Sequence, residues 1–240
     1  SQVTDFFNDG AGDLKYSSLT SDSSLGGGEL RVSNVLAYVS PSFGGVKLVA
    51  AAVPSEGSKL NDAGATKDSG LADTYSAALM YGSTKKGLYL AAAMDSYGQQ
   101  SYKAHDGSTL ANTDATYTRF SAQYATGGLV INGMYAMTDL NNSKVGANLD
   151  SNTMLIGAAY TMGKFTPKAK YSVSSWDKKN DASTVFGINA TDKTMVGLGL
   201  DYALGKKTTG YVEYVAVDGA KFGTKKTEDN TVSVGLLHKF

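Results

Sequence analysis

The feature that most restricts the fold of this chain is a regular alternation of apolar residues with small or polar ones. Between residues 195 and 204 the even positions are Val196, Leu198, Leu200, Tyr202 and Leu204, whereas the odd positions are mostly Gly, Asp and Ala. The same alternation recurs at 129–137 and 231–240. Because successive side chains of a β-strand point to opposite faces, these segments predict strands with one apolar face.

Segments of this kind follow one another along the whole chain. We count eleven, at residues 29–39, 45–53, 73–82, 87–96, 115–125, 128–138, 152–162, 165–175, 194–204, 208–218 and 230–240. Each has about 9–11 residues, the length that crosses a lipid bilayer as a tilted strand. The links at 40–44, 83–86, 126–127, 163–164 and 205–207 are short, and those at 54–72, 97–114, 139–151, 176–193 and 219–229 are long. Short turns alternating with long outer loops are typical of an all-β, antiparallel up-and-down transmembrane β-barrel.

A soluble β-sandwich or a lipocalin-like barrel also shows alternation, and two observations weigh against it. Aromatic residues of the apolar parity stand at strand ends, as in an interfacial girdle: Tyr38, Tyr81, Tyr124, Tyr160, Tyr202 and Phe240. The opposite parity carries polar groups in mid-strand: Arg119, Ser121, Gln123, Lys168, Lys170, Ser172 and Asp201. A dry core would have to neutralise these groups, whereas a water-filled lumen solvates them.

Composition excludes several other classes of protein. The chain has no Cys, which rules out disulfides, Cys-based zinc sites and Cys nucleophiles. Its 22 Lys+Arg balance 22 Asp+Glu, so no basic footprint for nucleic acid exists. The two histidines do not pair, because His105 falls in a predicted loop and His238 on the apolar parity of the last strand. Without a catalytic or nucleotide-binding motif, we expect no enzyme, no cofactor and no metal site.

Eleven is an odd number, whereas an up-and-down barrel of one bacterial chain has an even number of strands. At this point four segments resemble Gram-negative general porins of the proteobacterial type. Arg31–Asn34 with Tyr38 and Ser40–Gly45 resembles their sixth strand and following turn, Asp201–Thr208 their turn between strands fourteen and fifteen, and Val234–Phe240 their C-terminal strand; Phe165–Tyr171 also fits. The Ser-Pro-Ser-Phe-Gly-Gly turn and the last seven residues are the most specific of these pieces.

The resemblance implies a sixteen-stranded, trimeric outer-membrane barrel, of which this chain would hold strands 6–16, the C-terminal two-thirds. Residues 1–28 would be a loop folded into the lumen at the constriction, and residues 29–240 the transmembrane strands with long outer loops. The implied partners are two further copies of the chain, outer-membrane lipid and lipopolysaccharide. The outer-membrane assembly machinery would recognise the C-terminal strand by its terminal aromatic residue, Phe240.

The resemblance also implies the residues of the pore. In such porins the lumen loop is acidic and faces a basic wall, so Asp5, Asp9 and Asp13 are the acidic candidates and Arg31 is the basic one. Arg119, Lys168, Lys170 and Asp201 are candidates for the pore wall. Two alternatives stay open: the Asp residues are turn formers beside Asn8, Gly10 and Gly12, and Arg31, Lys168 and Lys170 are solvated wall residues without a role in selectivity.

We therefore predict a passive diffusion channel for small hydrophilic solutes and ions in the bacterial outer membrane. One alternative is a substrate-selective channel on the same barrel. The other is a non-conducting structural or adhesive barrel whose function is carried by its long loops.

Overall fold

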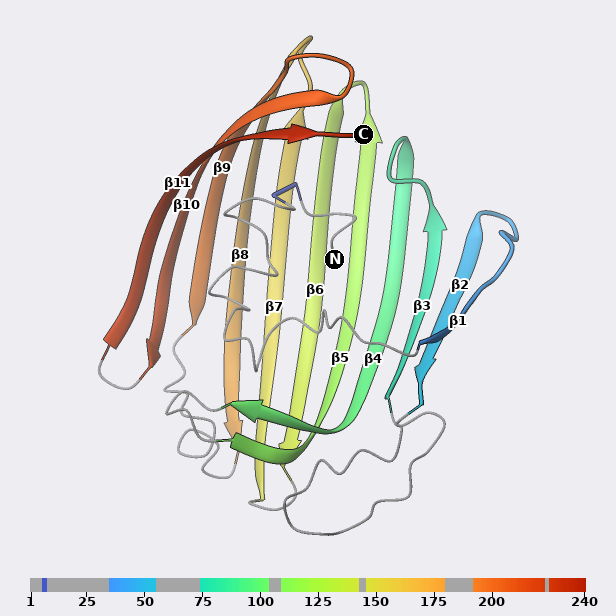
Figure 1. The fold of residues 1–240 in the computed structure, drawn as a ribbon, viewed down its shortest axis with the longest axis vertical. Helices are drawn as coiled ribbons and strands as arrows, with labels where there is room; N and C mark the ends of the chain where they lie inside the picture. The colour runs from blue at the N-terminus through green and yellow to red at the C-terminus, as the bar shows by residue number, and fades with distance from the viewer. Residues whose placement is uncertain are drawn as a thin grey trace.

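A computed structural model describes residues 6–7, 35–54, 74–103, 109–142, 146–179, 192–222 and 225–240. Within these residues the chain forms one antiparallel sheet in which every strand pairs with its neighbours in sequence (Figure 1). The strands are β1 (Leu36–Val39), β2 (Val46–Val53), β3 (Thr74–Gly82), β4 (Gly87–Lys103), β5 (Thr109–Thr126), β6 (Leu129–Asn142), β7 (Ala147–Tyr160), β8 (Phe165–Lys179), β9 (Lys193–Ala203), β10 (Thr208–Phe222) and β11 (Lys225–His238). The predicted all-β, up-and-down architecture with eleven strands is confirmed.

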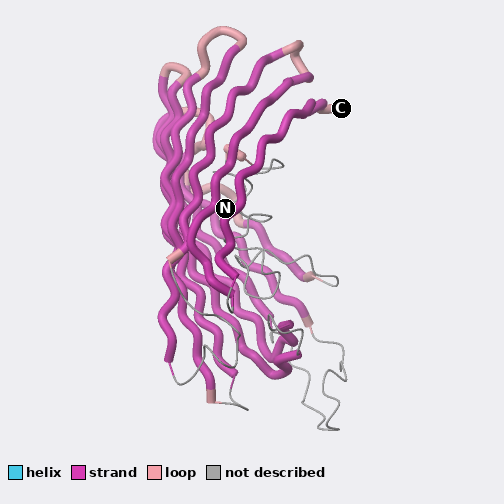
Figure 2. Tube along the Cα trace, turned by 90° about the vertical axis from the view of Figure 1, so that its left-hand side faces the viewer, coloured by secondary structure: helices cyan, strands magenta, loops and turns pink. Residues whose placement is uncertain are grey.

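The sheet is strongly curved and open, with β1 and β11 as its two edges among the described residues. Seen from the side it is bowed, so that it has one convex and one concave face (Figure 2). No helix in the described ranges is long and apolar enough to cross a membrane.

The alternation seen in the sequence separates the two faces. Large apolar side chains of one parity are exposed on the outside, among them Leu79, Phe120, Ile131, Ile156, Leu198 and Val234. The other parity is largely buried and mixes polar with apolar groups, among them Gln123, Asn132, Lys170, Ser172, Met195 and Glu213. A water-soluble sheet would bury the first set, so the outer face is suited to contact with lipid.

The strands extend further than expected at the end opposite the short turns. β4 and β5 have 17 and 18 residues, and β6 and β7 have 14 each. The expected long links at 97–114, 139–151 and 219–229 are therefore mostly strand. Backbone pairing does not require an apolar face, and these extensions are rich in Ser, Thr, Asn and Gln, so an alternation test cannot detect them.

Glycine at a positive φ closes the tight turn that joins β3 and β4. Gly82 has φ +82°, and a β-carbon there would collide with the backbone carbonyl oxygen of Leu88. A residue with a side chain is strained in this conformation, and the opposing backbone leaves it no space.

We expect Gly82→Ala to lower the free energy of unfolding by about 1–3 kcal/mol, the cost of a strained backbone conformation. Urea titration of the detergent-folded protein, followed by the gel shift between folded and heated samples, measures the change. Gly205→Ala is the matched control, because Gly205 lies in the turn after β9 with no positive φ and open space around it. Equal losses for both variants would contradict the prediction.

Candidate functional site

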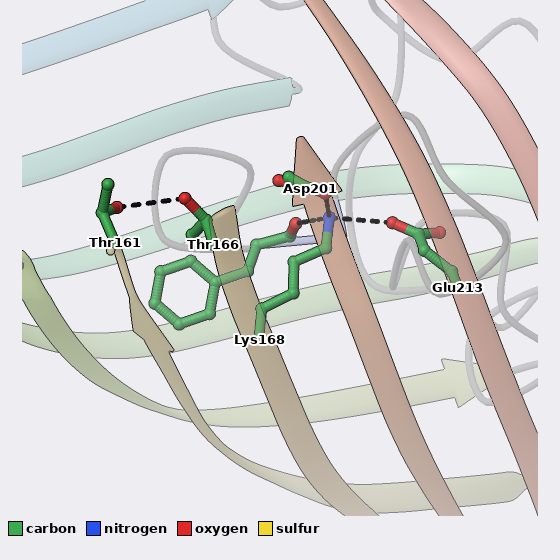
Figure 3. Close-up of polar contacts among 6 residues, drawn as sticks. Thr161, Thr166, Lys168, Asp201 and Glu213 are labelled. Atoms are coloured by element: carbon green, nitrogen blue, oxygen red, sulfur yellow. Dashed lines mark hydrogen bonds and ion pairs between the residues drawn. The ribbon is translucent and has the colours of Figure 1, made fainter. Parts of the chain in front are cut away.

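A lysine on the concave face of the sheet holds the main polar network. Lys168 on β8 places its Nζ 3.0 Å from Oδ1 of Asp201 on β9 and 2.9 Å from Oε1 of Glu213 on β10 (Figure 3). The same Nζ donates a hydrogen bond of 3.0 Å to the carbonyl oxygen of Phe6. The side chains of Lys168 and Glu213 are only 7% and 3% exposed, so water screens this ion pair weakly.

Strand register explains how Lys168 reaches a partner two strands away. Lys168 is paired with Gly199, and Gly199 is paired in turn with Glu213. A β-carbon at position 199 would lie 2.6 Å from Cε and 2.9 Å from Cγ of Lys168. The lysine stem therefore lies flat across Gly199, and only glycine leaves it room to do so.

Phe6 and Phe7 lie against the same wall. Phe7 is fully buried, and its ring centroid is 4.9 Å from Nζ of Lys168 and 5.0 Å from Nζ of Lys170. A β-carbon at Gly197 would lie 3.1 Å from Cζ of Phe7. The ring of Phe7 is thus bound by two ammonium groups within cation–π range, and it packs over the glycine beneath it.

The ring of Phe6 uses a second glycine of the wall. A β-carbon at Gly157 would lie 3.2 Å from two carbons of this ring. Gly157 on β7 and Gly197 on β9 both pair with Lys170 on β8, so the two rings occupy the space that the glycines leave on either side of this lysine. Residues 6 and 7 are thereby fixed to the concave face through their rings and through the carbonyl of Phe6.

A second ion pair lies further along the wall. Arg119 on β5 pairs with Asp95 on β4 through its Nη2 and the carboxylate Oδ2. Both side chains are largely buried, at 12% and 9% exposure. The positive charges of Arg119 and Lys168 are therefore balanced locally by carboxylates of the wall itself.

A model of the Gram-negative porin family matches residues 1–221 of the chain. The chain belongs to the Gram-negative porin family. A comparison with curated protein sequences finds no match. Family membership and fold together place this porin in the bacterial outer membrane as a β-barrel protein.

Several solved outer-membrane structures share its fold at low sequence identity. An anion-selective porin from Comamonas acidovorans superposes with a TM-score of 0.64 at 19% identity, covering 86% of this chain and 59% of that one. OmpT, an outer membrane protein of Vibrio cholerae, gives 0.63 at 15% identity, with 85% and 63% covered. The outer membrane channel DcaP of Acinetobacter baumannii gives 0.63 at 14% identity, with 86% and 62% covered. The porin chain thus spans about three-fifths of the length of these structures.

The residues predicted from the sequence fall into two groups. Asp5, Asp9, Asp13 and Arg31 lie outside the described residues of the porin, so their roles stay predictions. The four wall candidates, Arg119, Lys168, Lys170 and Asp201, all lie on the concave face. The structure joins Lys168 with Asp201 and brings Lys168 and Lys170 to one phenylalanine ring, while Arg119 belongs to a separate pair.

Sequence reasoning missed the partners of these residues. Asp95 and Glu213 neutralise the wall cations, and each stands in mid-strand on the polar parity, which is a signal that a search for acids as well as bases would have found. Gly157, Gly197 and Gly199 act through the absence of a side chain. Their function depends on which residue crosses from the neighbouring strand, and that requires the register.

Proposed function

We propose that the complete protein is a passive diffusion channel for small hydrophilic solutes and ions. The observation that carries this proposal is the pairing of an apolar outer face with a charged concave face on which a separate chain segment rests. An apolar exterior suits lipid, and a polar interior lets water and solutes pass. Family and fold indicate a channel rather than an enzyme.

Residues 1–28 are proposed to be the constriction segment inside this channel. Phe6 and Phe7 support the assignment, because they belong to this segment and are docked on the concave wall. Asp5 is the immediate neighbour of Phe6 in the sequence, and Asp9 lies two residues beyond Phe7. We propose that Asp5, Asp9 and Asp13 face a basic wall that includes Arg31, and that residues 29–240 supply the barrel strands.

We propose that the basic residues of the described wall, Lys168, Lys170 and Arg119, have a structural role and do not set ion preference. Arg119 is neutralised by Asp95, and the positive charge of Lys168 is outweighed by Asp201 and Glu213, so neither cation presents a free positive charge to a passing ion. Lys170 lies beside the ring of Phe7. We propose that these groups hold the wall and the docked segment together, and that ion preference is set mainly by unpaired charges elsewhere along the pore.

The assembly is proposed from the family. A homotrimer, contact with lipopolysaccharide, and recognition of the C-terminal strand by the outer-membrane assembly machinery would all be expected. Phe240 is fully exposed at the end of the sheet, where a recognition factor has access to it.

Planar-bilayer recording tests the proposed function on the complete protein. Stepwise conductance in groups of three that rises in proportion to salt supports the trimeric diffusion channel. Conductance that saturates with one sugar or one anion would instead favour the substrate-selective channel. Silence of folded, heat-modifiable protein would refute conduction and favour the structural or adhesive barrel.

A further inference from the structure

The charges of this chain are not evenly distributed over the sheet, although their sum is zero. All five short links and the chain end after β11 lie at one edge of the sheet, the upper edge in Figure 1. This edge, which we call the turn rim, comprises residues 38–47, 81–88, 125–130, 159–166, 202–209 and 237–240. It contains no Asp or Glu, and its lysines are Lys47, Lys85, Lys86, Lys164, Lys206, Lys207 and Lys239.

These seven lysines are exposed, and no carboxylate among the described residues pairs with them. The opposite ends of the strands differ in this respect, since they carry Asp114, Asp139, Asp150 and Asp218. Among the described residues the turn rim is therefore a positively charged edge whose lysines have no Asp or Glu partner. Such an edge attracts anions, most strongly at low ionic strength.

The position of the lysines relative to the aromatic residues indicates which anions they meet. Tyr81, Tyr160 and Tyr202 each precede a rim lysine by four residues, namely Lys85, Lys164 and Lys206. Tyr81 and Tyr160 are exposed on the outer face, where aromatic rings mark the level of the lipid headgroups. The lysines lie just beyond this level, where the phosphates of a membrane leaflet are found.

One contact directs the charge outward. Nζ of Lys164 lies 5.9 Å from the ring centroid of Tyr202, and this ring also packs against Phe165 with centroids 4.8 Å apart. Phe165 is exposed on the outer, lipid-facing side of β8. The ammonium group of Lys164 is therefore held beside the aromatic belt and not over the concave face.

We propose that the turn rim is a docking surface for the headgroups of anionic phospholipids in the leaflet that borders it. Each lysine near an anionic surface adds about 1 kcal/mol of attraction, roughly fivefold in affinity. The aromatic belt fixes the depth of the barrel, and the rim lysines select the charge of the lipid around it. This role does not depend on conduction. The lipid site can therefore be refuted without refuting the proposed diffusion function, and the reverse also holds.

Native mass spectrometry of the detergent-folded protein with added phosphatidylglycerol or phosphatidylcholine tests the proposal. The wild-type protein is expected to retain phosphatidylglycerol preferentially. In the variant K85Q/K86Q/K206Q/K207Q we expect the preference for phosphatidylglycerol to fall roughly tenfold. This is less than the full effect of four lysines at about 1 kcal/mol each. The control K178Q/K179Q/K225Q/K226Q removes the same number of lysines from the opposite ends of β8 and β11 and should keep it.

Circular dichroism and heat modifiability establish that each variant is folded. Unchanged retention in the rim variant, or equal loss in the control variant, would overturn the proposal. Inorganic phosphate distinguishes lipid from free anion: it should weaken retention no more than chloride does at equal ionic strength. Specific displacement by phosphate would show that the rim binds dissolved anions, and the lipid assignment would be wrong.

Discussion

Phe7→Ala is expected to release the segment around residues 6 and 7 from the concave wall. Phe7 is fully buried, and its ring touches the space above Gly197 between the ammonium groups of Lys168 and Lys170. Removing a buried phenylalanine ring costs about 3–5 kcal/mol in a closed core. At this wall we expect about 2–3 kcal/mol, because water can fill the vacated site, and this still lowers the docked-to-free ratio at least tenfold.

Two measurements report the release. Limited proteolysis with mass detection should show faster cleavage on the N-terminal side of residue 28 in Phe7→Ala. Single-channel records of the complete protein should show a higher mean conductance with more current noise if the docked segment forms the proposed constriction.

Phe43→Ala is the matched control for this experiment. Phe43 is a phenylalanine of the same size that lies in the turn between β1 and β2, where it is 71% exposed. Its loss should leave proteolysis near residues 6–7 unchanged. A Phe7→Ala variant with wild-type proteolysis and conductance would show that the ring does not hold the segment.

Removal of both carboxylates around Lys168 is the second large change. In the double variant Asp201→Asn/Glu213→Gln the ammonium group loses both of its negatively charged partners, while the carbonyl of Phe6, the ring of Phe7 and the two amide oxygens remain beside it. Breaking a buried ion pair by removing one side costs about 3–5 kcal/mol. Asp201 is 29% exposed, so we expect a cost near the lower end of this range.

The same variant should also shift ion preference. The wall changes from a net charge of −1 for Lys168, Asp201 and Glu213 to +1, so anions should become more permeant by several-fold at low salt. The reversal potential in a salt gradient measures this shift.

A neutral triple variant separates lost pairing from lost shape. Lys168→Met/Asp201→Asn/Glu213→Gln keeps similar volumes and removes the charge at all three positions, and it should regain most of the stability lost by the double variant. Its reversal potential should return towards that of the wild-type protein. If the triple variant were as unstable as the double one, the network would act through its hydrogen-bond geometry and not through charge balance.

The fold was predictable to the extent that it depends on side-chain alternation. Val196, Leu198 and Leu200 identify β9 because three apolar residues share a parity. The extension of β4 to Lys103 lacks such a signal, because residues 98–103 carry no alternation of apolar with polar residues. Local pattern therefore predicted the number and order of strands better than their length.

The sequence predicts which face of the sheet the site residues lie on, but not which residues they contact. Lys168 and Asp201 were placed on one face because each stands in mid-strand among residues of the polar parity. Glu213 lies on the next strand over, and its contact with Lys168 depends on a register that aligns both with Gly199. Register is a property of the assembled sheet, so no single segment of sequence contains it.

The stem of Lys168 crosses Gly199 and reaches Glu213, which couples the packing of three positions on three neighbouring strands. A side chain introduced at 199 would push the lysine into the pore, and the two carboxylates would then face each other without a counter-ion. A redesign of this wall for a new solute should therefore keep glycine at 199 as long as Lys168 is kept, and exchange residues 168, 201 and 213 together. A library that varies these three charged positions one at a time would miss the combination in which all three are uncharged.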